Sequence, residues 1–170
     1  VVVEESASSR AAFYDQIRIN RPASYFATAS GGLGFALPGA VGVALARPEQ
    51  PVLCVVGDGA AMFAIQAIWT AARYETPVVF AVIDNGQYGI LKAFAAFQRT
   101  PGVPGLDLPG LDIAKIARGM SAEAHRAASA AELPAACVEA FANARSRRGP
   151  VLLDIVVDPE IGDLFGQPTG

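Results

Sequence analysis

Two apolar, β-branched runs constrain the fold of this chain more than any other feature. The first covers residues 52–56 and stops at Gly57-Asp58-Gly59, and the second covers 78–83 and stops at Asp84-Asn85-Gly86. Runs that are apolar on both faces are typical of parallel strands with helices on both sides. A helical pattern over residues 63–74 separates the two runs. One crossover helix would therefore bring both strands to the same edge of one sheet.

The remainder of the chain repeats this alternation of short strands and helical segments. We expect further strands at residues 1–3, 25–28, 122–127 and 151–157, and helices at 10–17, 35–46, 90–97, 112–118 and 130–147. Alternation of this kind predicts an α/β fold with an open, mostly parallel sheet and helices on both faces. A length of 170 residues fits one domain, residues 1–170, with a sizeable core. Residues 100–110 hold three prolines and three glycines and are expected to form a long loop, a common feature of active-site lids.

Composition and charge exclude several classes of protein. Hydrophobic residues make up 52% of the chain and charged residues 17%, which predicts that a partner covers part of the surface. A net charge of −3 without a basic cluster argues against nucleic-acid binding. No apolar run reaches transmembrane length and no signal segment opens the chain. We expect a cytoplasmic protein with Cys54 and Cys137 as reduced core thiols, and a start at Val1 rather than Met favours a longer parent polypeptide.

The polar residues that end the two apolar runs are candidate metal ligands. The carboxyl ends of adjacent parallel strands form the edge where open α/β sheets bind ligands. The Asp58 carboxylate and the Asn85 amide oxygen are hard ligands suited to Mg²⁺ or Ca²⁺. Glycines on both sides of Asp58 would let a phosphorylated cofactor approach the backbone closely. Each motif alone is also a common turn sequence after a strand, but the two at one-crossover spacing favour the metal interpretation.

Gly57-Asp58-Gly59 followed by Asn85 resembles the motif of the thiamine diphosphate-dependent enzymes, GDG, roughly two dozen residues, then N. Over residues 4–157 the chain is similar to the C-terminal pyrophosphate-binding domain of the benzoylformate decarboxylases, as seen in SYFATASGGLGFALPGAVGVALA, GDGAAMFAIQAIWTAARYETPVVFAVIDNGQYGILKAFA and VPGLDLPGLD. The resemblance implies thiamine diphosphate and Mg²⁺ (or Ca²⁺) as cofactors. It also implies a third metal contact, from the main-chain carbonyl of Gln87.

The resemblance assigns cofactor contacts to several turns. Ser8 and Ser9 would lie beside the diphosphate, although serine at this place could equally cap a helix. The carbonyl of Gly31 would accept a hydrogen bond from the 4′-amino group. Leu33 would support the bent cofactor, with a role in the core as the alternative. The complete implied set is Ser8, Ser9, Gly31, Gly32, Leu33, Gly57, Asp58, Gly59, Ala60, Phe63, Asn85, Gln87, Tyr88 and Gly89.

Three positions depart from the family pattern. Ala60 stands where relatives often have serine, and Phe63 stands where the benzoylformate decarboxylases have tyrosine, so two hydroxyl contacts are lost. The diphosphate would then depend on backbone N–H groups. Asp84 replaces a common asparagine and is either an extra charge near the metal or a turn former. A dinucleotide site is disfavoured, because Leu37 occupies the place of the third glycine of that fingerprint.

The resemblance and the local sequence pattern also suggest roles for side chains outside the cofactor turns. Leu91 and Phe94 match positions that line the substrate pocket in the benzoylformate decarboxylases, where they would suit a phenyl-sized 2-oxo acid; core packing is the alternative. Ile65, Ile68, Trp69 and Ala72 are expected to form one buried stripe. His125, the only histidine, is expected on a surface strand. The tail from 158 to 170 contains Phe165 and is expected to pack over a neighbouring surface.

The resemblance implies a domain of a 2-oxo acid decarboxylase, which would convert benzoylformate to benzaldehyde and CO₂. No catalytic residue is expected in this chain, because by resemblance the activating glutamate and the catalytic histidines belong to a pyrimidine-binding domain of the same or a neighbouring subunit. A homodimer or homotetramer is expected, with a small 2-oxo acid as substrate and neither nucleic acid nor membrane as partner. The alternatives are an acetolactate synthase-like carboligase, the cofactor-binding subunit of a two-chain decarboxylase, or a non-catalytic assembly module.

Overall fold

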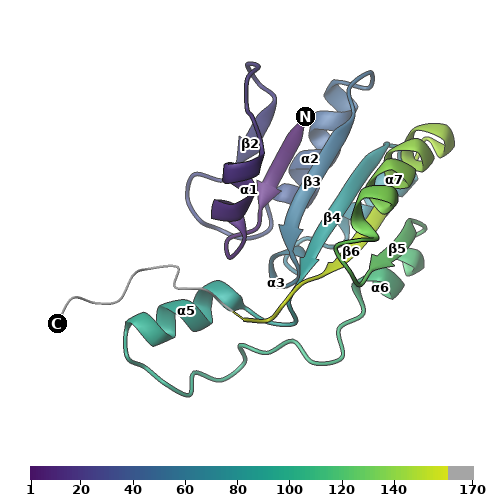
Figure 1. Cartoon of the computed structure of the whole chain (residues 1–170). Coiled ribbons are helices and arrows are strands. Elements are labelled where there is room, and N and C mark those ends of the chain that lie inside the picture. The colour runs from purple at the N-terminus through teal and green to yellow at the C-terminus, as the bar shows by residue number, and fades with distance from the viewer. Residues whose placement is uncertain (161–170) are drawn as a thin grey trace.

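Within residues 1–160, which this computed structural model describes, six strands form one all-parallel sheet in the order β2-β1-β3-β4-β6-β5 (Figure 1). The strands are β1 (Val2–Glu5), β2 (Tyr25–Ala27), β3 (Val52–Gly57), β4 (Val78–Asp84), β5 (Glu123–Ala127) and β6 (Val151–Val156). The sheet confirms the expected α/β class, and β3 pairs directly with β4 as the single crossover predicts.

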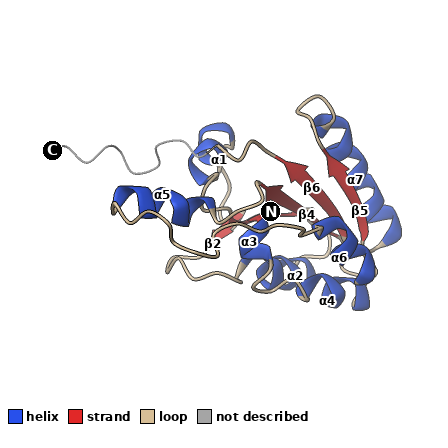
Figure 2. Ribbon diagram, turned by 90° about the horizontal axis from the view of Figure 1, so that it is seen from below, coloured by secondary structure: helices blue, strands red, loops and turns tan. Residues whose placement is uncertain are grey.

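Helices cover both faces of the sheet (Figure 2). They are α1 (Arg10–Gln16), α2 (Ala36–Ala46), α3 (Asp58–Ala61), α4 (Ala67–Arg73), α5 (Gly89–Phe97), α6 (Ile113–Gly119) and α7 (Leu133–Arg147). A large core, with Phe80 and Leu152 at its centre, lies under α2, α4 and α6. A smaller core, with Val79 and Leu153, lies under α7. Neighbouring residues of one strand therefore enter different cores, as the two-residue period of a strand requires.

The direction of winding reverses between β1 and β3. The chain leaves β1 through α1 toward β2 at one edge, whereas it leaves β3 through α3 and α4 toward β4 on the other side. Figure 2 shows α1 on the face opposite α2, α3 and α4. Such a reversal opens a crevice at the carboxyl ends of the two strands.

The helix expected at 63–74 is interrupted. Helix α3 begins at Asp58 itself and ends at Ala61, and α4 begins only at Ala67. The buried face of α4 consists of Ala67, Ile68 and Ala71. Trp69 points away from that face and is 55% exposed, so its assignment to the buried stripe is wrong. Alanines allow close packing of α4 on α2, and the larger indole is left outside.

Other expected elements are confirmed with small changes at their ends. Asp112 caps α6 by accepting the backbone N–H of Lys115 at 2.8 Å. Helix α7 begins three residues later than expected, with a proline in its first turn, where a missing N–H costs nothing. Cys54 is buried, Cys137 is half-buried, and both thiols are free. The expectation for Phe165 lies outside the described residues.

Helix α5 and the loop after it extend beyond the carboxyl ends of β3, β4 and β6 (Figure 1). The loop lacks regular structure over most of its length, as expected for residues 100–110. Two backbone hydrogen bonds join it to the turn after β4, from Tyr88 N–H to Leu106 O at 2.8 Å and from Leu108 N–H to Gly86 O at 2.9 Å. None of the helices within residues 1–160 combines the length and the apolar character needed to cross a bilayer.

Candidate cofactor-binding site

The expected site residues gather at the carboxyl edge of the sheet. Gly57 pairs with Ile83 and Glu5 pairs with Val56, so the turns after β1, β3 and β4 leave the sheet side by side. A small hollow of about 50 Å³ lies between these turns. The expected cofactor residues that line it are Ser8, Ser9, Leu33, Gly57, Asp58, Gly59, Ala60, Asn85, Gln87, Tyr88 and Gly89. Gly31, Gly32 and Phe63 do not line this hollow.

Asp58 joins the two motifs that the sequence analysis paired. The residue is 3% exposed. Its Oδ1 accepts the backbone N–H of Gly59 at 2.8 Å, and its Oδ2 accepts that of Gly86 at 2.8 Å. Gly86 lies between Asn85 and Gln87, so this second bond holds the turn after β3 against the turn after β4. Burial raises the pKa of Asp58, and the Asp84 carboxylate raises it further, against the opposing effect of the two N–H groups.

Gly59 is held close to an aromatic ring. A Cβ at this position would lie 2.5 Å from Cε1 of Tyr88, which is closer than any van der Waals contact allows. The missing side chain therefore permits the Tyr88 ring to lie over the start of α3. The glycine after Asp58 has a packing function here in addition to keeping the backbone accessible.

A group of carboxylates continues from Asp58 into the sheet. Asp84 ends β4, and Asp154 in β6 is fully buried. Arg126 of β5 donates to Oδ2 of Asp154 at 2.6 Å and lies 3.5 Å from Oδ2 of Asp84. Oδ1 of Asp154 has no hydrogen-bond partner within residues 1–160. Burial and the charge of Asp84 raise the pKa of Asp154 to about 6, although the Arg126 guanidinium opposes the change.

The alternatives to cofactor contact at Ser9 and Leu33 are not supported. Ser9 occupies the N-cap position of α1, yet its side chain makes no capping hydrogen bond. Leu33 is 39% exposed rather than part of the core. It lies in a turn that contains Gly31 at φ +70° and Gly34 at φ +97°, a backbone conformation that favours glycine. An exposed leucine between glycines is suited to contact with something outside the domain.

The two expected substrate residues lie on the projecting helix. Leu91 is 47% exposed and Phe94 is 48% exposed, three residues apart on α5. The buried part of α5 is confined to Gly89. Core packing, the alternative interpretation of both side chains, therefore disagrees with the structure.

The sequence matches a family model described as "Thiamine pyrophosphate enzyme, C-terminal TPP binding domain" over residues 6–155. The chain belongs to the thiamine pyrophosphate enzymes. Benzoylformate decarboxylase of Pseudomonas aeruginosa is 46% identical over 91% of this chain and 29% of its own length. The putative acetolactate synthase large subunit IlvX of Mycobacterium tuberculosis is 37% identical over 95% of this chain and 32% of its own.

Solved structures give the same result. A benzoylformate decarboxylase from Polynucleobacter necessarius superimposes with a TM-score of 0.91 and 39% identity, over 96% of this chain and 31% of that one. A thiamine diphosphate-dependent 4-hydroxybenzoylformate decarboxylase from Rhodococcus jostii RHA1 superimposes with a TM-score of 0.85 and 39% identity, over 96% of this chain and 30% of that one. The chain thus spans about a third of the length of these relatives, in the part that binds thiamine pyrophosphate.

Two charged residues of this thiamine pyrophosphate domain were missed by the sequence analysis. Glu5 is 2% exposed and accepts backbone N–H groups of the turn before α2. Lys92 donates from Nζ to Oε1 of Gln87 at 2.5 Å and to Oδ1 of Asp107 at 2.5 Å. The sequence signal that could have identified Glu5 is its position as an acidic residue at the end of an apolar strand. Nothing local marks Lys92, because its partners lie in two different turns.

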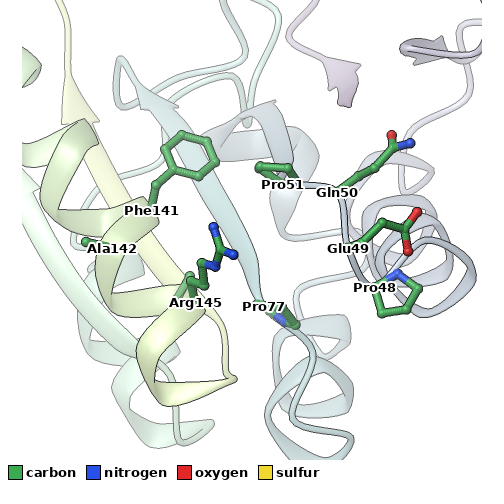
Figure 3. A pocket seen from close by; sticks show the side chains of 9 residues that line it. Pro48, Glu49, Gln50, Pro51, Pro77, Phe141, Ala142 and Arg145 are labelled. Atoms are coloured by element: carbon green, nitrogen blue, oxygen red, sulfur yellow. The ribbon is translucent and has the colours of Figure 1, made fainter.

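A larger hollow, of about 610 Å³, lies at the other end of the sheet. Figure 3 shows Phe141 and Arg145 projecting from α7 toward Pro51 and Pro77, which precede β3 and β4. None of the expected cofactor residues lines it. The residues expected to contact thiamine pyrophosphate thus line the smaller hollow and not this larger one.

Proposed function

We propose that this chain is the diphosphate- and metal-binding domain of a thiamine diphosphate-dependent decarboxylase that acts on an aromatic 2-oxo acid such as benzoylformate. The observation that carries the proposal is the hydrogen bond between Asp58 and the turn that presents Asn85 and Gln87. It joins the two halves of the expected metal site at the edge where α/β sheets bind ligands. Similarity to benzoylformate decarboxylases over most of the chain supports the substrate class.

The donor set fits a hard divalent cation. Asp58, Asn85 and the carbonyl of Gln87 would hold Mg²⁺. The two oxygens of Asp58 accept N–H groups, but each carboxylate oxygen has a second lone pair that can bind a metal. The neighbouring carboxylates of Asp84 and Asp154 are paired with the single guanidinium of Arg126. A bound cation would offset the remaining negative charge and lower the pKa of Asp58.

The remaining turns would hold the organic cofactor. When bound, thiamine diphosphate supplies a cationic thiazolium ring that accepts the electrons released as CO₂ leaves the substrate. Ser8 and Ser9 would donate hydroxyl hydrogen bonds to the diphosphate, and Leu33 would support the rings through its exposed side chain. Ala60 and Phe63 offer no hydroxyl, so backbone N–H groups have the larger part in binding. Orientation of the cofactor before the substrate arrives is the contribution of this domain to the rate.

The proposed enzyme requires a further domain. His125 donates from Nε2 to Oε1 of Glu123 at 2.6 Å on the edge strand β5, away from the hollow, and is not placed for catalysis. We propose that a pyrimidine-binding domain of the same or a neighbouring subunit supplies the proton-transfer groups, in a homodimer or homotetramer. Exposed Phe63 and Trp69, at 57% and 55%, are apolar surface of the kind that such an assembly covers.

The metal site is tested by calorimetry on the full-length protein in magnesium buffer. Asp58→Ala removes the one carboxylate among the proposed ligands and is expected to abolish binding of thiamine diphosphate. Glu49→Ala, an exposed substitution at the opposite end of the sheet, is the control and should bind as wild type does. Unchanged binding by Asp58→Ala would refute the site.

The reaction is tested by product analysis. With benzoylformate the proposal requires benzaldehyde and CO₂. The similarity to a putative acetolactate synthase large subunit favours a second candidate, a carboligase that forms an acetohydroxy acid from pyruvate. The loss of two hydroxyls at Ala60 and Phe63 favours a third, a non-catalytic assembly module, for which the full-length protein would not bind the cofactor at all.

A further inference from the structure

The carboxylate of Glu5 connects the sheet to the turn that carries Leu33. Glu5 ends β1 and is 2% exposed. Its Oε1 accepts the backbone N–H of Gly34 at 2.6 Å, and its Oε2 accepts those of Phe35 and Ala36 at 2.7 and 2.6 Å. We infer that Glu5 is a positioning residue, which sets the place of Leu33 and Gly31 against thiamine diphosphate; this inference rests on the proposed function.

The three N–H groups lie where the chain enters α2: Ala36 is the first residue of the helix, Phe35 is its N-cap and Gly34 precedes the cap. The first N–H groups of a helix have no partner inside the helix. The N-cap residue of α2 is Phe35, whose side chain cannot accept a hydrogen bond, and no side-chain cap is made. A carboxylate from a distant strand therefore performs the capping function, with the added attraction of the helix dipole for negative charge.

The turn before α2 has little else to hold it. Within residues 1–160, the hydrogen bond from Gly34 to Glu5 is the one that joins residues 31–34 to the sheet. Gly31 and Gly34 have positive φ, and glycine leaves a chain many other conformations. A Cβ at Gly34 would lie 3.3 Å from Cβ of Phe63, so the turn is also packed against the segment after α3. Loss of the Glu5 hydrogen bond would leave the turn packed against Phe63 but no longer attached to the sheet.

Glu5 lines the hollow together with Asp58 and Leu33. Both of its oxygens accept hydrogen bonds from the backbone of the turn before α2 and the first residue of that helix. The preceding residue, Glu4, lies on the other face of β1, where it accepts from Arg10 Nε at 2.9 Å and from Tyr25 Oη at 2.8 Å. Glu4 thus joins the end of β1 to α1 and β2, whereas Glu5 joins it to the turn before α2.

The test is Glu5→Gln in the full-length protein. The amide places an NH₂ group against a backbone N–H, which breaks at least one of the three bonds. We expect binding of thiamine diphosphate at fixed Mg²⁺ to weaken by about tenfold or more, with faster hydrogen exchange at the amides of residues 34–36. The near-ultraviolet circular dichroism band of the saturated cofactor should also change, because that band reports the relative orientation of its rings.

Glu123→Gln is the matched control. Glu123 accepts from Asn143, Arg147 and His125 at the far edge of the sheet, so this variant should lose stability without loss of affinity or change in the dichroism band. Measurements are made well below the melting temperature of both variants. If Glu5 contributes only to stability, Glu5→Gln should resemble Glu123→Gln, with unchanged cofactor affinity and an unchanged dichroism band.

The outcomes separate this inference from the proposed function. Absence of Mg²⁺-dependent cofactor binding by the wild type overturns both. In a second outcome, the wild type binds the cofactor, Glu5→Gln binds it with an affinity within about twofold of wild type, and hydrogen exchange at residues 34–36 is faster. This outcome leaves the proposed function intact and overturns the positioning role. If Glu5→Gln does not fold, Glu5→Asp replaces it; the shorter side chain should bind the cofactor more weakly than wild type, and equal affinity overturns the inference.

Discussion

At the scale of single residues, the carboxyl edge combines close packing with unbalanced charge. Gly59 leaves room for the Tyr88 ring. The buried carboxylate of Asp58 accepts hydrogen bonds from two backbone N–H groups. Asp154 is buried with one oxygen unpaired within the described residues. Arrangements of this kind cost stability and persist where they position groups for a ligand.

Gly59→Ala tests the packing at Tyr88. The added Cβ would overlap the ring, so Tyr88 and the start of α5 must move, at a cost of about 1–3 kcal/mol in the free energy of unfolding. Gly57→Ala is the control, because a Cβ there meets nothing within 4 Å. Thermal unfolding compares the two variants. Equal stability of both would show that the ring has space to shift without cost.

Asp154→Asn tests the buried carboxylate. The pKa of Asp154 is raised to about 6, above the value of about 4 usual for an unfolded chain. A group with a raised pKa stabilises the fold below its unfolded pKa, and this contribution is lost as the pH rises through the folded value. The asparagine variant should therefore be more stable than wild type by roughly 1–2 kcal/mol near pH 7.5 and similar to it near pH 4.

Denaturant titrations across this pH range, with chelator present to keep the protein free of metal, provide the measurement. Asp15→Asn, an exposed substitution on α1, should show no such trend. A wild type that is more stable than Asp154→Asn near pH 7.5, with the difference shrinking toward pH 4, would contradict the assignment, since it would indicate that the ionised carboxylate stabilises the fold.

At the scale of elements, Lys92 connects α5, the turn after β4 and the long loop. Its ammonium group bridges Gln87 and Asp107, and the Gln87 side chain also donates to the carbonyl of Pro159. Three segments therefore meet at the residue whose carbonyl is a proposed metal ligand. The ion pair with Asp107 is exposed and therefore contributes little to the free energy of unfolding. Its main effect is to position the long loop against α5.

Lys92→Met should loosen the loop while changing the free energy of unfolding by less than about 1 kcal/mol. Hydrogen exchange at the amides of Tyr88 and Leu108, which pair with the opposite turn, is expected to become faster. Lys115→Met removes an exposed ion pair with Asp112 on α6 and should leave those two amides unchanged. Identical exchange in wild type and Lys92→Met would show that the backbone bonds alone hold the loop.

The extent of correct prediction follows from the range of each interaction. The strands and the juxtaposition of Asp58 with the turn at Asn85 could be predicted, because β-branched runs and one crossover determine them locally. The break between α3 and α4 and the exposure of Trp69 could not, because the packing of small alanines on α2 decides them. The contacts of Glu5 and Lys92 also escaped prediction, since their partners depend on how separate turns meet.

At the scale of the whole molecule, this domain holds one side of a site. The curated relatives are about three times as long as the chain. Leu33, which lines the hollow at the carboxyl edge, is exposed, as are Leu91 and Phe94 on α5. Among the described residues that line the hollow there is no histidine. Under the proposed function, a second domain encloses the cofactor and completes the chemistry.

Residues 1–170 expressed alone should therefore have no detectable decarboxylase activity. Benzoylformate consumption in the presence of Mg²⁺ and thiamine diphosphate is the assay, with the full-length protein as positive control. Benzaldehyde formation by the isolated domain would show that the chain contains its own catalytic groups.

The reversal of winding between β1 and β3 has a practical consequence for engineering. The crevice arises from the course of the chain through the sheet. Gly89 and Ile90 at the start of α5 line the hollow there, whereas the rest of α5 and the loop that follows it do not. Those outer segments carry the side chains proposed to select the substrate. Exchange of residues 91–110 with the matching segment of a related enzyme, with Lys92 and Asp107 retained, should thus change the substrate specificity and leave the proposed metal ligands in place.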